Sequence, residues 1–240
     1  MEPVEFWNKV FSEASDRSRI EMPNMASSLL QSALAHFGDV RNKVVMDLGC
    51  GNGSASLFFA YHGASVISVD YSEKAIDNFS QFCADHSIRS IRPVCLPAQD
   101  IGTLGKADYI YGSEILHHIE PFDEFARTLR DTVNPDGRLF FQENNAQSRI
   151  MIWFRRHLVG KLWIPKYGDT EESPLAQSEI DELGRYFQVR VEYPELVYFR
   201  MMSKYLFRGH LMALCQSADN YCYRFRWLRK SSYKQYLFLS

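Results

Sequence analysis

The fold of this 240-residue chain is decided by the stretch Val44-Val45-Met46-Asp47-Leu48-Gly49-Cys50-Gly51-Asn52-Gly53. An apolar run ends in an acid, and three glycines follow at alternate positions before a helix-compatible segment over residues 54–60. This pattern predicts a buried strand, a tight turn and a helix N-terminus. Glycine suits the turn because its backbone adopts positive φ and can approach a ligand closely. The helix start adds free N–H groups and a partial positive charge.

The spacing of the glycines indicates which ligand this turn holds. A dinucleotide-binding turn has the pattern Gly-x-Gly-x-x-Gly, whereas Gly49, Gly51 and Gly53 alternate. Asp47 would repel a pyrophosphate but suits a positive charge, such as the amino group of an amino acid. We therefore expect a ligand with a cationic amino-acid part. Another nucleotide-binding turn is the alternative.

Two further acids follow later strands. Asp70 ends a strand over residues 65–70, where one carboxylate can accept hydrogen bonds from both hydroxyls of a ribose. Asp100 follows a weaker strand over residues 91–96, which Pro93 marks as an edge strand. A helix N-cap is the alternative role for Asp70, although Ser72 already caps the helix expected over residues 73–86. A plain surface turn is the alternative for Asp100.

The next two strands, over residues 107–113 and 138–143, also end in polar residues. The first leads into Ser113, Glu114 and the pair His117-His118, and the second into Glu143-Asn144-Asn145. Ligands of open α/β sheets bind at the carboxyl ends of the strands, so these side chains should line one site. A histidine with a near-neutral pKa can take a proton from a hydroxyl or amine, which makes His118 a candidate general base. A structural histidine that hydrogen-bonds the loop is the alternative, and we favour it for His117.

These motifs together resemble the class I S-adenosylmethionine-dependent methyltransferases over about residues 40–145. Residues 47–53 match the family's Asp-x-Gly-x-Gly-x-Gly motif, Leu116-His117-His118-Ile119 matches a recurrent segment after the fourth strand, and Asn134-Pro135-Asp136-Gly137 matches the turn before the fifth. The resemblance implies an α/β fold with a doubly wound, seven-stranded Rossmann-like sheet. It also implies S-adenosyl-L-methionine as the cofactor.

The resemblance also implies roles for individual residues. The glycine loop with Asp47 would hold the methionyl part, Asp70 the ribose, and Asp100 with the backbone of Ile101 the adenine. The predicted cofactor-binding residues are Asp47, Gly49, Cys50, Gly51, Gly53, Asp70, Tyr71, Gln99, Asp100, Ile101 and Ser113. The predicted catalytic residues are His118, His117 and Glu114, and the predicted acceptor-binding residues are Glu143, Asn144, Asn145, Arg149, Trp153 and Tyr167.

Two signatures of related enzymes are missing. Nucleic-acid base methyltransferases carry Asn/Asp-Pro-Pro-Tyr/Phe at the end of the fourth strand, where this chain has Gly112-Ser113-Glu114-Ile115. Catechol-type enzymes bind Mg²⁺ partly through an Asp-Asn pair at the end of the fifth strand, but the companion acid of the fourth strand has no clear match here. We therefore expect neither nucleic acid nor a metal at the site.

Composition sets wider bounds. The net charge is −2, but residues 1–144 carry 12 Lys/Arg against 20 Asp/Glu, and residues 145–240 carry 15 against 9. The basic C-terminal part therefore faces a different partner from the core. Five scattered cysteines, without a Cys-x-x-Cys pair, fit reduced thiols in the cytoplasm and no zinc site. The N-terminus lacks a signal-peptide pattern, and no apolar run is long enough to span a bilayer.

We expect residues 1–240 to form a single domain. A helical leader over residues 1–40, whose Phe6, Trp7 and Arg17 could close the site, precedes the core over residues 41–145. Basic, aromatic inserts at 146–177 and 197–230 should form a helical cap over the carboxyl edge of the sheet. Further helices are expected at 25–37, 122–133 and 179–187, and Ser178 should cap the last of them. Strands are expected at 188–193 and 233–239, the latter antiparallel at the sheet's edge.

Three interpretations of the inserts remain open: a helical lid with its own small core, a pocket for an aromatic or anionic acceptor, and a surface lying on an anionic membrane. The predicted function is methyl transfer to an O or N atom of a small molecule. The protein must then align the reactants, exclude water and, where required, remove a proton. A membrane-associated methyltransferase of a lipid-like substrate and a non-catalytic cofactor-binding domain are the alternatives, and the oligomeric state is left open.

Overall fold

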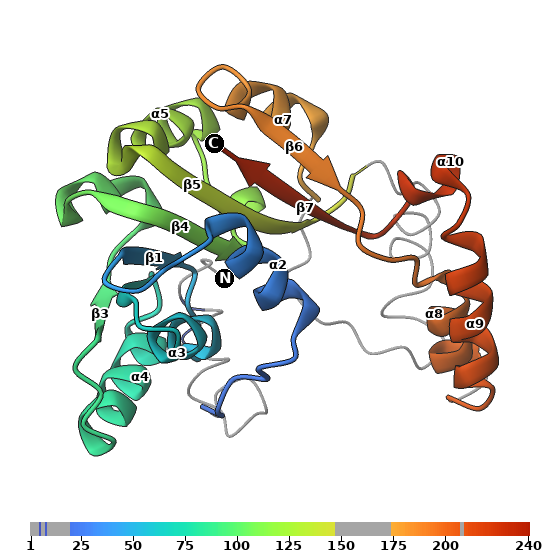
Figure 1. The fold of residues 1–240 in the computed structure, drawn as a ribbon, viewed down its shortest axis with the longest axis horizontal. Coiled ribbons are helices and arrows are strands. Elements are labelled where there is room, and N and C mark those ends of the chain that lie inside the picture. The colour runs from blue at the N-terminus through green and yellow to red at the C-terminus, as the bar shows by residue number, and fades with distance from the viewer. Residues whose placement is uncertain (1–4, 6–7, 9–19, 147–173, 207–208) are drawn as a thin grey trace.

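The computed structural model describes residues 5, 8, 20–146, 174–206 and 209–240. One seven-stranded sheet forms its centre, in the order β3-β2-β1-β4-β5-β7-β6 (Figure 1). Its strands are β1 (Val44–Leu48), β2 (Ser65–Asp70), β3 (Ile91–Cys95), β4 (Ala107–Ser113), β5 (Val133–Asn144), β6 (Val189–Glu192) and β7 (Lys234–Leu239). The strands β1 to β5 pair in parallel, and β7 pairs antiparallel with β5 and β6. The predicted α/β fold is confirmed.

Helices cover both faces of the sheet. They are α2 (Ser28–Phe37), α3 (Ser54–Tyr61), α4 (Glu73–Asp85), α5 (Phe122–Thr132), α7 (Gln177–Leu183), α8 (Tyr198–Leu206), α9 (Met212–Cys222) and α10 (Arg226–Arg229), with 3₁₀ turns η1 (Ala98–Leu104) and η2 (Leu116–His118). Successive residues of β1 point to opposite faces of the sheet. Val45 belongs to the hydrophobic core on one face, with Phe58 of α3, and Met46 belongs to the core on the other face, with Phe125 of α5.

The local sequence explains the helices next to the site. In α5, Phe122, Phe125 and Leu129 recur at helical spacing, and all three are buried against the sheet. The hydroxyl of Ser72 accepts a hydrogen bond from the amide of Ala75 at 3.2 Å, so the predicted cap of α4 is confirmed. This cap fixes the start of α4 directly after β2.

Several boundaries differ from the sequence prediction. The last strand, β7, lies between β5 and β6 rather than at the edge, because β6 pairs with its far side. Helix α7 starts at Gln177, where Glu179 accepts the amide of Ala176 at 2.6 Å, so the predicted cap by Ser178 is wrong. Residues 134–137 bulge from the start of β5 instead of preceding it. Strand β3 does lie at the edge, as Pro93 indicated.

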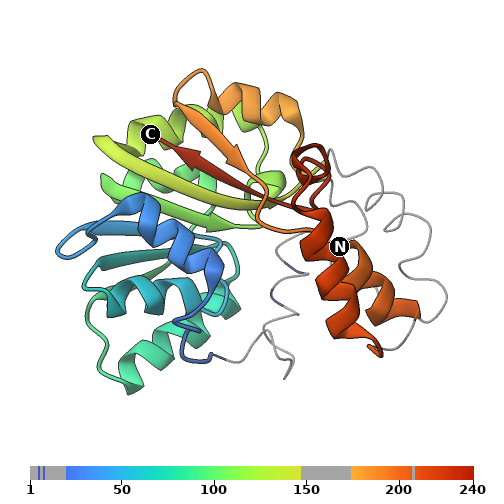
Figure 2. The same cartoon turned by 45° about the vertical axis from the view of Figure 1, so that its right-hand side comes forward.

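The helices α8, α9 and α10 lie beyond the carboxyl ends of the parallel strands (Figures 1 and 2). Asp219 of α9 is buried and joins α8 to α9, because its carboxylate accepts the amides of Phe199 and Arg200, each at 3.0 Å. Arg200 also forms ion pairs with Asp219 and Glu195. Thus α8 and α9 form a helical hairpin with its own internal support.

Candidate active site

The glycine loop, residues 49–53, joins β1 to α3. Gly49, Gly51 and Gly53 have φ angles of 66°, 50° and 76°, so the structure confirms the predicted positive φ at all three. The amide of Gly53 donates to the carbonyl of Cys50 at 2.8 Å and closes the turn. Burial raises the pKa of the Cys50 thiol well above its usual range, so this side chain stays neutral.

Asp70 ties the glycine loop to the end of β2. One carboxylate oxygen accepts the amide of Gly51 and the other accepts the amide of Ser72, each at 2.8 Å. Each oxygen can accept a second hydrogen bond, which leaves capacity for a ligand hydroxyl. Burial raises the pKa of Asp70, although these amides oppose the shift. Tyr71, the next residue, is 55% exposed and available to pack on a ligand.

Asp47 lies beneath the loop at the end of β1. Its side chain is buried, and its carboxylate accepts the hydroxyl of Ser56 at 2.5 Å. Burial raises the pKa of Asp47 to about 7; the hydrogen bond from Ser56 opposes this shift and the charge of Asp70 adds to it. The sequence predicts that Asp47 meets a ligand amine, whereas in the structure its carboxylate faces Ser56 of α3. A cation at the loop would favour its charged form.

The turn η1 carries the residues predicted to meet an adenine. The amide of Leu96 donates to the carbonyl of Asp70 at 3.0 Å, which places the chain before η1 beside the end of β2. Gln99 and Asp100 are exposed, and Gln99 donates to the carbonyl of Glu120 at 3.2 Å. The side chain of Ile101 is buried, so only its backbone can serve a ligand.

Ser113 and Glu114 end β4 beside a residue that the sequence analysis missed. Gln142 of β5 is buried; it accepts the Ser113 hydroxyl at 3.1 Å and donates to the Glu114 carboxylate at 3.5 Å. Glu114 is exposed and has φ 55°, which is unusual for a residue other than glycine and is common at functional sites. Gln142 could have been found only from the register of β4 and β5, in which it pairs with Ser113.

Glu143 clamps the histidine turn η2. One of its oxygens accepts the amides of Ile115 and Leu116 at 2.9 and 2.7 Å, and the other lies 2.6 Å from Nδ1 of His117. The side chains of both Glu143 and His117 are buried. His118 is exposed, and its ring lies 4.1 Å from that of His117. Glu143 was expected at the acceptor, but these contacts give it a positioning role.

The two asparagines after Glu143 differ in their surroundings. The side-chain amide of Asn145 donates to the carbonyls of Lys230 and Ser232, each at 2.9 Å, and so fastens the base of the helical cap. Asn144 is 7% exposed, and its Oδ1 has no hydrogen-bond partner among the described residues. Arg149, Trp153 and Tyr167 lie outside the described residues, as do Phe6, Trp7 and Arg17.

The leader residue Asn8 contacts the start of α4, directly after β2. Its side-chain oxygen accepts the Ser72 hydroxyl at 2.7 Å and the Lys74 amide at 3.3 Å. The leader therefore reaches the start of α4, beside Asp70.

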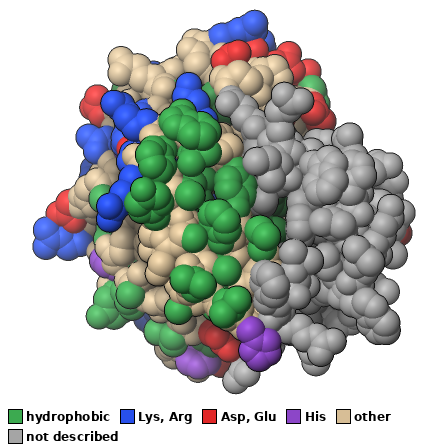
Figure 3. All heavy atoms as spheres, turned by 90° about the vertical axis from the view of Figure 1, so that its right-hand side faces the viewer, with side chains coloured by type: hydrophobic (Ala, Val, Ile, Leu, Met, Phe, Trp, Pro, Cys, Tyr) green, Lys and Arg blue, Asp and Glu red, His purple; other side chains and the backbone are tan. Residues whose placement is uncertain are grey.

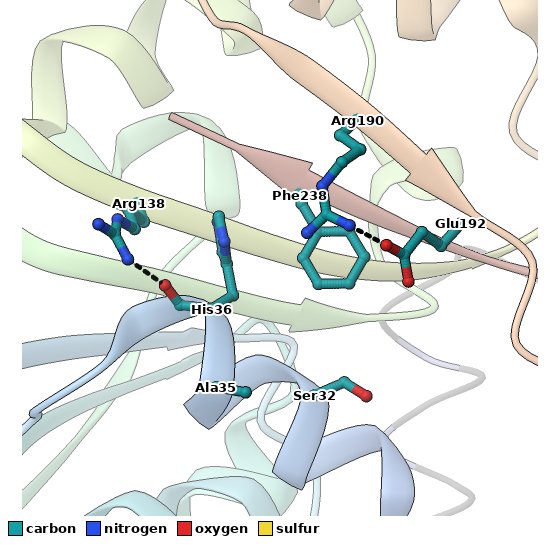
Figure 4. A pocket seen from close by; sticks show the side chains of 7 residues that line it. All are labelled: Ser32, Ala35, His36, Arg138, Arg190, Glu192 and Phe238. Atoms are coloured by element: carbon teal, nitrogen blue, oxygen red, sulfur yellow. Dashed lines mark hydrogen bonds and ion pairs between the residues drawn. The ribbon is translucent and has the colours of Figure 1, made fainter.

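A separate cavity of about 340 Å³ lies between α2 and the strands β5 to β7 (Figure 4). It is lined by Ser32, Ala35, His36, Arg138, Arg190, Glu192 and Phe238. Arg138 donates to the carbonyl of His36 at 2.6 Å, and Arg190 pairs with Glu192 above the ring of Phe238. None of the predicted site residues lines it, and its arginines already have partners.

The residues at the carboxyl edge fit the expected cofactor. Gly49 has no room for a bulky side chain, since a Cβ there would lie 3.1 Å from Ile115. Burial raises the pKa of both Asp47 and Asp70, and a cation beside them would stabilise their charged carboxylates. Among the residues that the structure describes, no group of three or more His, Cys, Asp or Glu is arranged to hold a metal ion.

Removing the Glu143 carboxylate should loosen η2. Glu143→Ala leaves the buried amide of Leu116 and that of Ile115 without acceptors, so we expect a loss of about 2–5 kcal/mol in the free energy of unfolding. Glu143→Gln keeps one acceptor oxygen and should cost clearly less. Urea denaturation of both variants measures the difference; equal losses would contradict the clamp.

Comparisons with known proteins agree with this geometry. A family model described as a methyltransferase domain matches residues 19–193, well over half of the chain. The ubiquinone biosynthesis O-methyltransferase of Rickettsia bellii (strain OSU 85-389) is 22% identical over 190 residues, which cover 78% of this chain and 77% of that protein.

Two solved structures share the fold. A SAM-dependent methyltransferase from Aquifex aeolicus gives a TM-score of 0.60 at 14% identity and covers 97% of both chains. The N-methyltransferase NodS from Bradyrhizobium japonicum WM9, in complex with S-adenosyl-L-homocysteine, gives 0.58 at 14% identity and covers 80% of this chain and 89% of NodS. With the matched family model, the glycine loop and the strand order, these findings show that the chain belongs to the class I S-adenosylmethionine-dependent methyltransferases.

Proposed function

We propose that this protein transfers the methyl group of S-adenosylmethionine to an oxygen or nitrogen atom of a small molecule. The observation that carries the proposal is the loop of three positive-φ glycines bonded to Asp70 at the end of β2. The relative from Rickettsia bellii is named an O-methyltransferase and NodS an N-methyltransferase, which supports both kinds of acceptor atom. The family assignment favours an enzyme over a non-catalytic domain and does not favour a lipid-like substrate.

When bound, the cofactor supplies a methyl group activated by a sulfonium. The chain's own part is to hold and orient its partners. The glycine loop would hold the methionyl end above Asp47, Asp70 would accept from the ribose hydroxyls, and Asp100 with the backbone of Ile101 would meet the adenine. Tyr71, which is exposed, would cover the nucleoside. Cys50, Gln99 and Ser113 complete the proposed cofactor set.

The acceptor would lie between the ends of β4 and β5. Asn144 supports this placement because its buried Oδ1 has no hydrogen-bond partner within the described part of the chain and suits a donor on the acceptor. We assign proton removal to the exposed His118, with Glu114 nearby at the end of β4. His117, held by Glu143, would fix the turn that carries His118. His118→Ala should lower kcat at unchanged cofactor affinity.

The cofactor assignment is tested by calorimetry with S-adenosylmethionine and S-adenosylhomocysteine. Asp70→Asn removes a charged acceptor and cannot accept both the Gly51 and Ser72 amides, so we expect the affinity to fall about 10–100-fold. Asp136→Asn, an exposed acid on the bulge of β5, should leave it unchanged. Binding of nicotinamide or flavin nucleotides alone would contradict the proposed function.

We further propose that residues 1–240 act as one domain in the cytoplasm, with a small-molecule substrate, no nucleic acid and no metal. Support for a reducing compartment comes from Cys50, Cys83, Cys95, Cys215 and Cys222, which are all free thiols. Within the described ranges, no helix combines the length and apolarity needed to cross a membrane.

A further inference from the structure

Exposed apolar side chains gather on the helical cap. Among the described residues, ten large hydrophobic side chains are exposed, and seven of them fall between residues 202 and 227. They are Met202, Leu211, Met212, Leu214, Tyr221, Phe225 and Trp227. Figure 3 faces this side of the molecule and shows hydrophobic side chains spread across it, with Lys and Arg along one margin. Such a concentration marks an interaction surface rather than ordinary scatter.

Two of these side chains share one face of α9. Leu214 and Tyr221 are seven residues apart and so lie on one side of the helix, and they are 66% and 60% exposed. The ring of Tyr221 meets that of Phe225 at 5.7 Å, which extends the stripe beyond the helix end. Asp219, in contrast, is turned toward α8 and buried. The side chains of Leu214 and Tyr221 are therefore available to a partner outside the described residues.

The charge of the same segment is almost entirely positive. Residues 197–230 carry seven Lys or Arg and a single acid, Asp219. That acid is buried and pairs with Arg200, so it does not offset the exposed cations Lys204, Arg224, Arg226 and Lys230. The basic residues are Arg200, Lys204, Arg208, Arg224, Arg226, Arg229 and Lys230. Trp227, which is 73% exposed, lies between Arg226 and Arg229 on α10.

We propose that the cap surface, formed by α8, α9 and α10, docks on the surface of an anionic lipid bilayer. Exposed aromatic and aliphatic side chains would enter the headgroup boundary, while the flanking arginines and lysines meet the anionic headgroups. Charge complementarity selects this partner over a neutral protein surface. The broad exposed apolar stripe favours lipid over nucleic acid, for which phosphate contacts by basic residues dominate.

Docking would place the bilayer near the proposed active site. The cap is fastened to the end of β5 by Asn145, and the hydroxyl of Tyr223 donates to the carbonyl of Tyr193 after β6 at 2.6 Å. These contacts hold the cap at the carboxyl edge of the sheet, on the same edge as the glycine loop (Figure 2). The proposal goes beyond methyl transfer and does not require the acceptor to be a lipid.

The test is co-sedimentation of the full chain with vesicles of phosphatidylglycerol and phosphatidylcholine, against phosphatidylcholine alone. We expect binding to the anionic vesicles only, weakened at least tenfold by high salt. Because each cation near an anionic surface contributes about fivefold, Arg226→Glu with Lys230→Glu should lower binding at least twentyfold. Leu214→Ser with Trp227→Ser should lower it at least tenfold.

The matched control reverses two exposed arginines at the other edge of the sheet, Arg89→Glu with Arg92→Glu, with the same change in net charge. It should sediment like the unmodified protein, and Tyr61→Ser should as well. Calorimetric affinity for S-adenosylmethionine should stay unchanged in the cap variants, which separates this test from that of the proposed function. The proposal would be overturned if the protein did not bind anionic vesicles, or if the control lost as much vesicle binding as the cap variants. It would also be overturned if the cap bound duplex DNA or a second copy of the chain in place of vesicles.

Discussion

Replacing Gly53 by alanine should lower the free energy of unfolding by about 3–5 kcal/mol, a large share of the stability of an ordinary domain. A Cβ at this position would lie 2.2 Å from the ring of Phe79. Phe79 is fully buried in α4 and cannot swing into solvent. Gly53 also has φ 76°, which residues with an L side chain rarely adopt. Urea denaturation measures the loss.

Gly105→Ala provides the matched control for the steric part of this effect. Gly105 has φ 96°, but nothing lies within 4 Å of a Cβ built on it. Only the backbone cost applies there, which for this conformation (ψ −169°) is about 1–3 kcal/mol. Equal losses in the two variants would show that the contact with Phe79 carries no weight. A folded Gly53→Ala protein should also bind the cofactor more weakly, because the loop would have to shift.

The second large effect is on the free energy of unfolding when Asp47 is replaced, and here we expect a gain in stability. The carboxyl has an ordinary pKa of 3.8 when unfolded, and burial raises it to about 7 in the folded protein. Between these values the folded protein holds a proton that the unfolded chain has released, so stability falls as the pH rises from about 4 to 7. The difference corresponds to about 4 kcal/mol. Asp47→Asn should therefore stabilise the unliganded protein at pH 8, with little gain at pH 4.

The same change should harm cofactor binding. A cation held above Asp47 favours its carboxylate, so binding releases a proton below pH 7 and the affinity should rise from pH 6 to 8. Asp47→Asn should weaken binding and remove this pH dependence, which calorimetry in two buffers can measure. Arg41 lowers the pKa of Asp39 to about 2, so Asp39→Asn should not stabilise the protein at pH 8. A destabilised Asp47→Asn protein at pH 8 would contradict this account.

The predictable part of the structure was local in sequence. The alternating glycines required positive φ whatever their neighbours, and all three adopt it. Pro93 cannot donate to a neighbouring strand, and β3 lies at the edge. The seven-stranded sheet was expected from the family resemblance, and the structure has seven strands in one sheet.

The unpredicted part depends on partners that are distant in sequence. Glu143 and His117 are 26 residues apart in the sequence. Whether Glu143 contacts the methyl acceptor or a backbone amide therefore depends on how η2 packs against the end of β5. Asn145 meets Lys230 and Ser232, which lie after the cap and whose position no local pattern encodes. The sequence therefore predicted polar residues at the ends of the strands, but not the backbone groups that Glu143 and Asn145 contact.

The position of β7 has a consequence for the order in which the chain folds. Among the strands that the structure describes, β6 pairs with β7 alone, and β7 follows it by more than 40 residues. During synthesis on the ribosome, β6 has no neighbouring strand until residues 234–239 emerge, and the side of β5 that β7 will cover stays open. Closing this half of the sheet is therefore a late event with a high entropic cost of loop closure, during which a chaperone would find bare strand edges to bind.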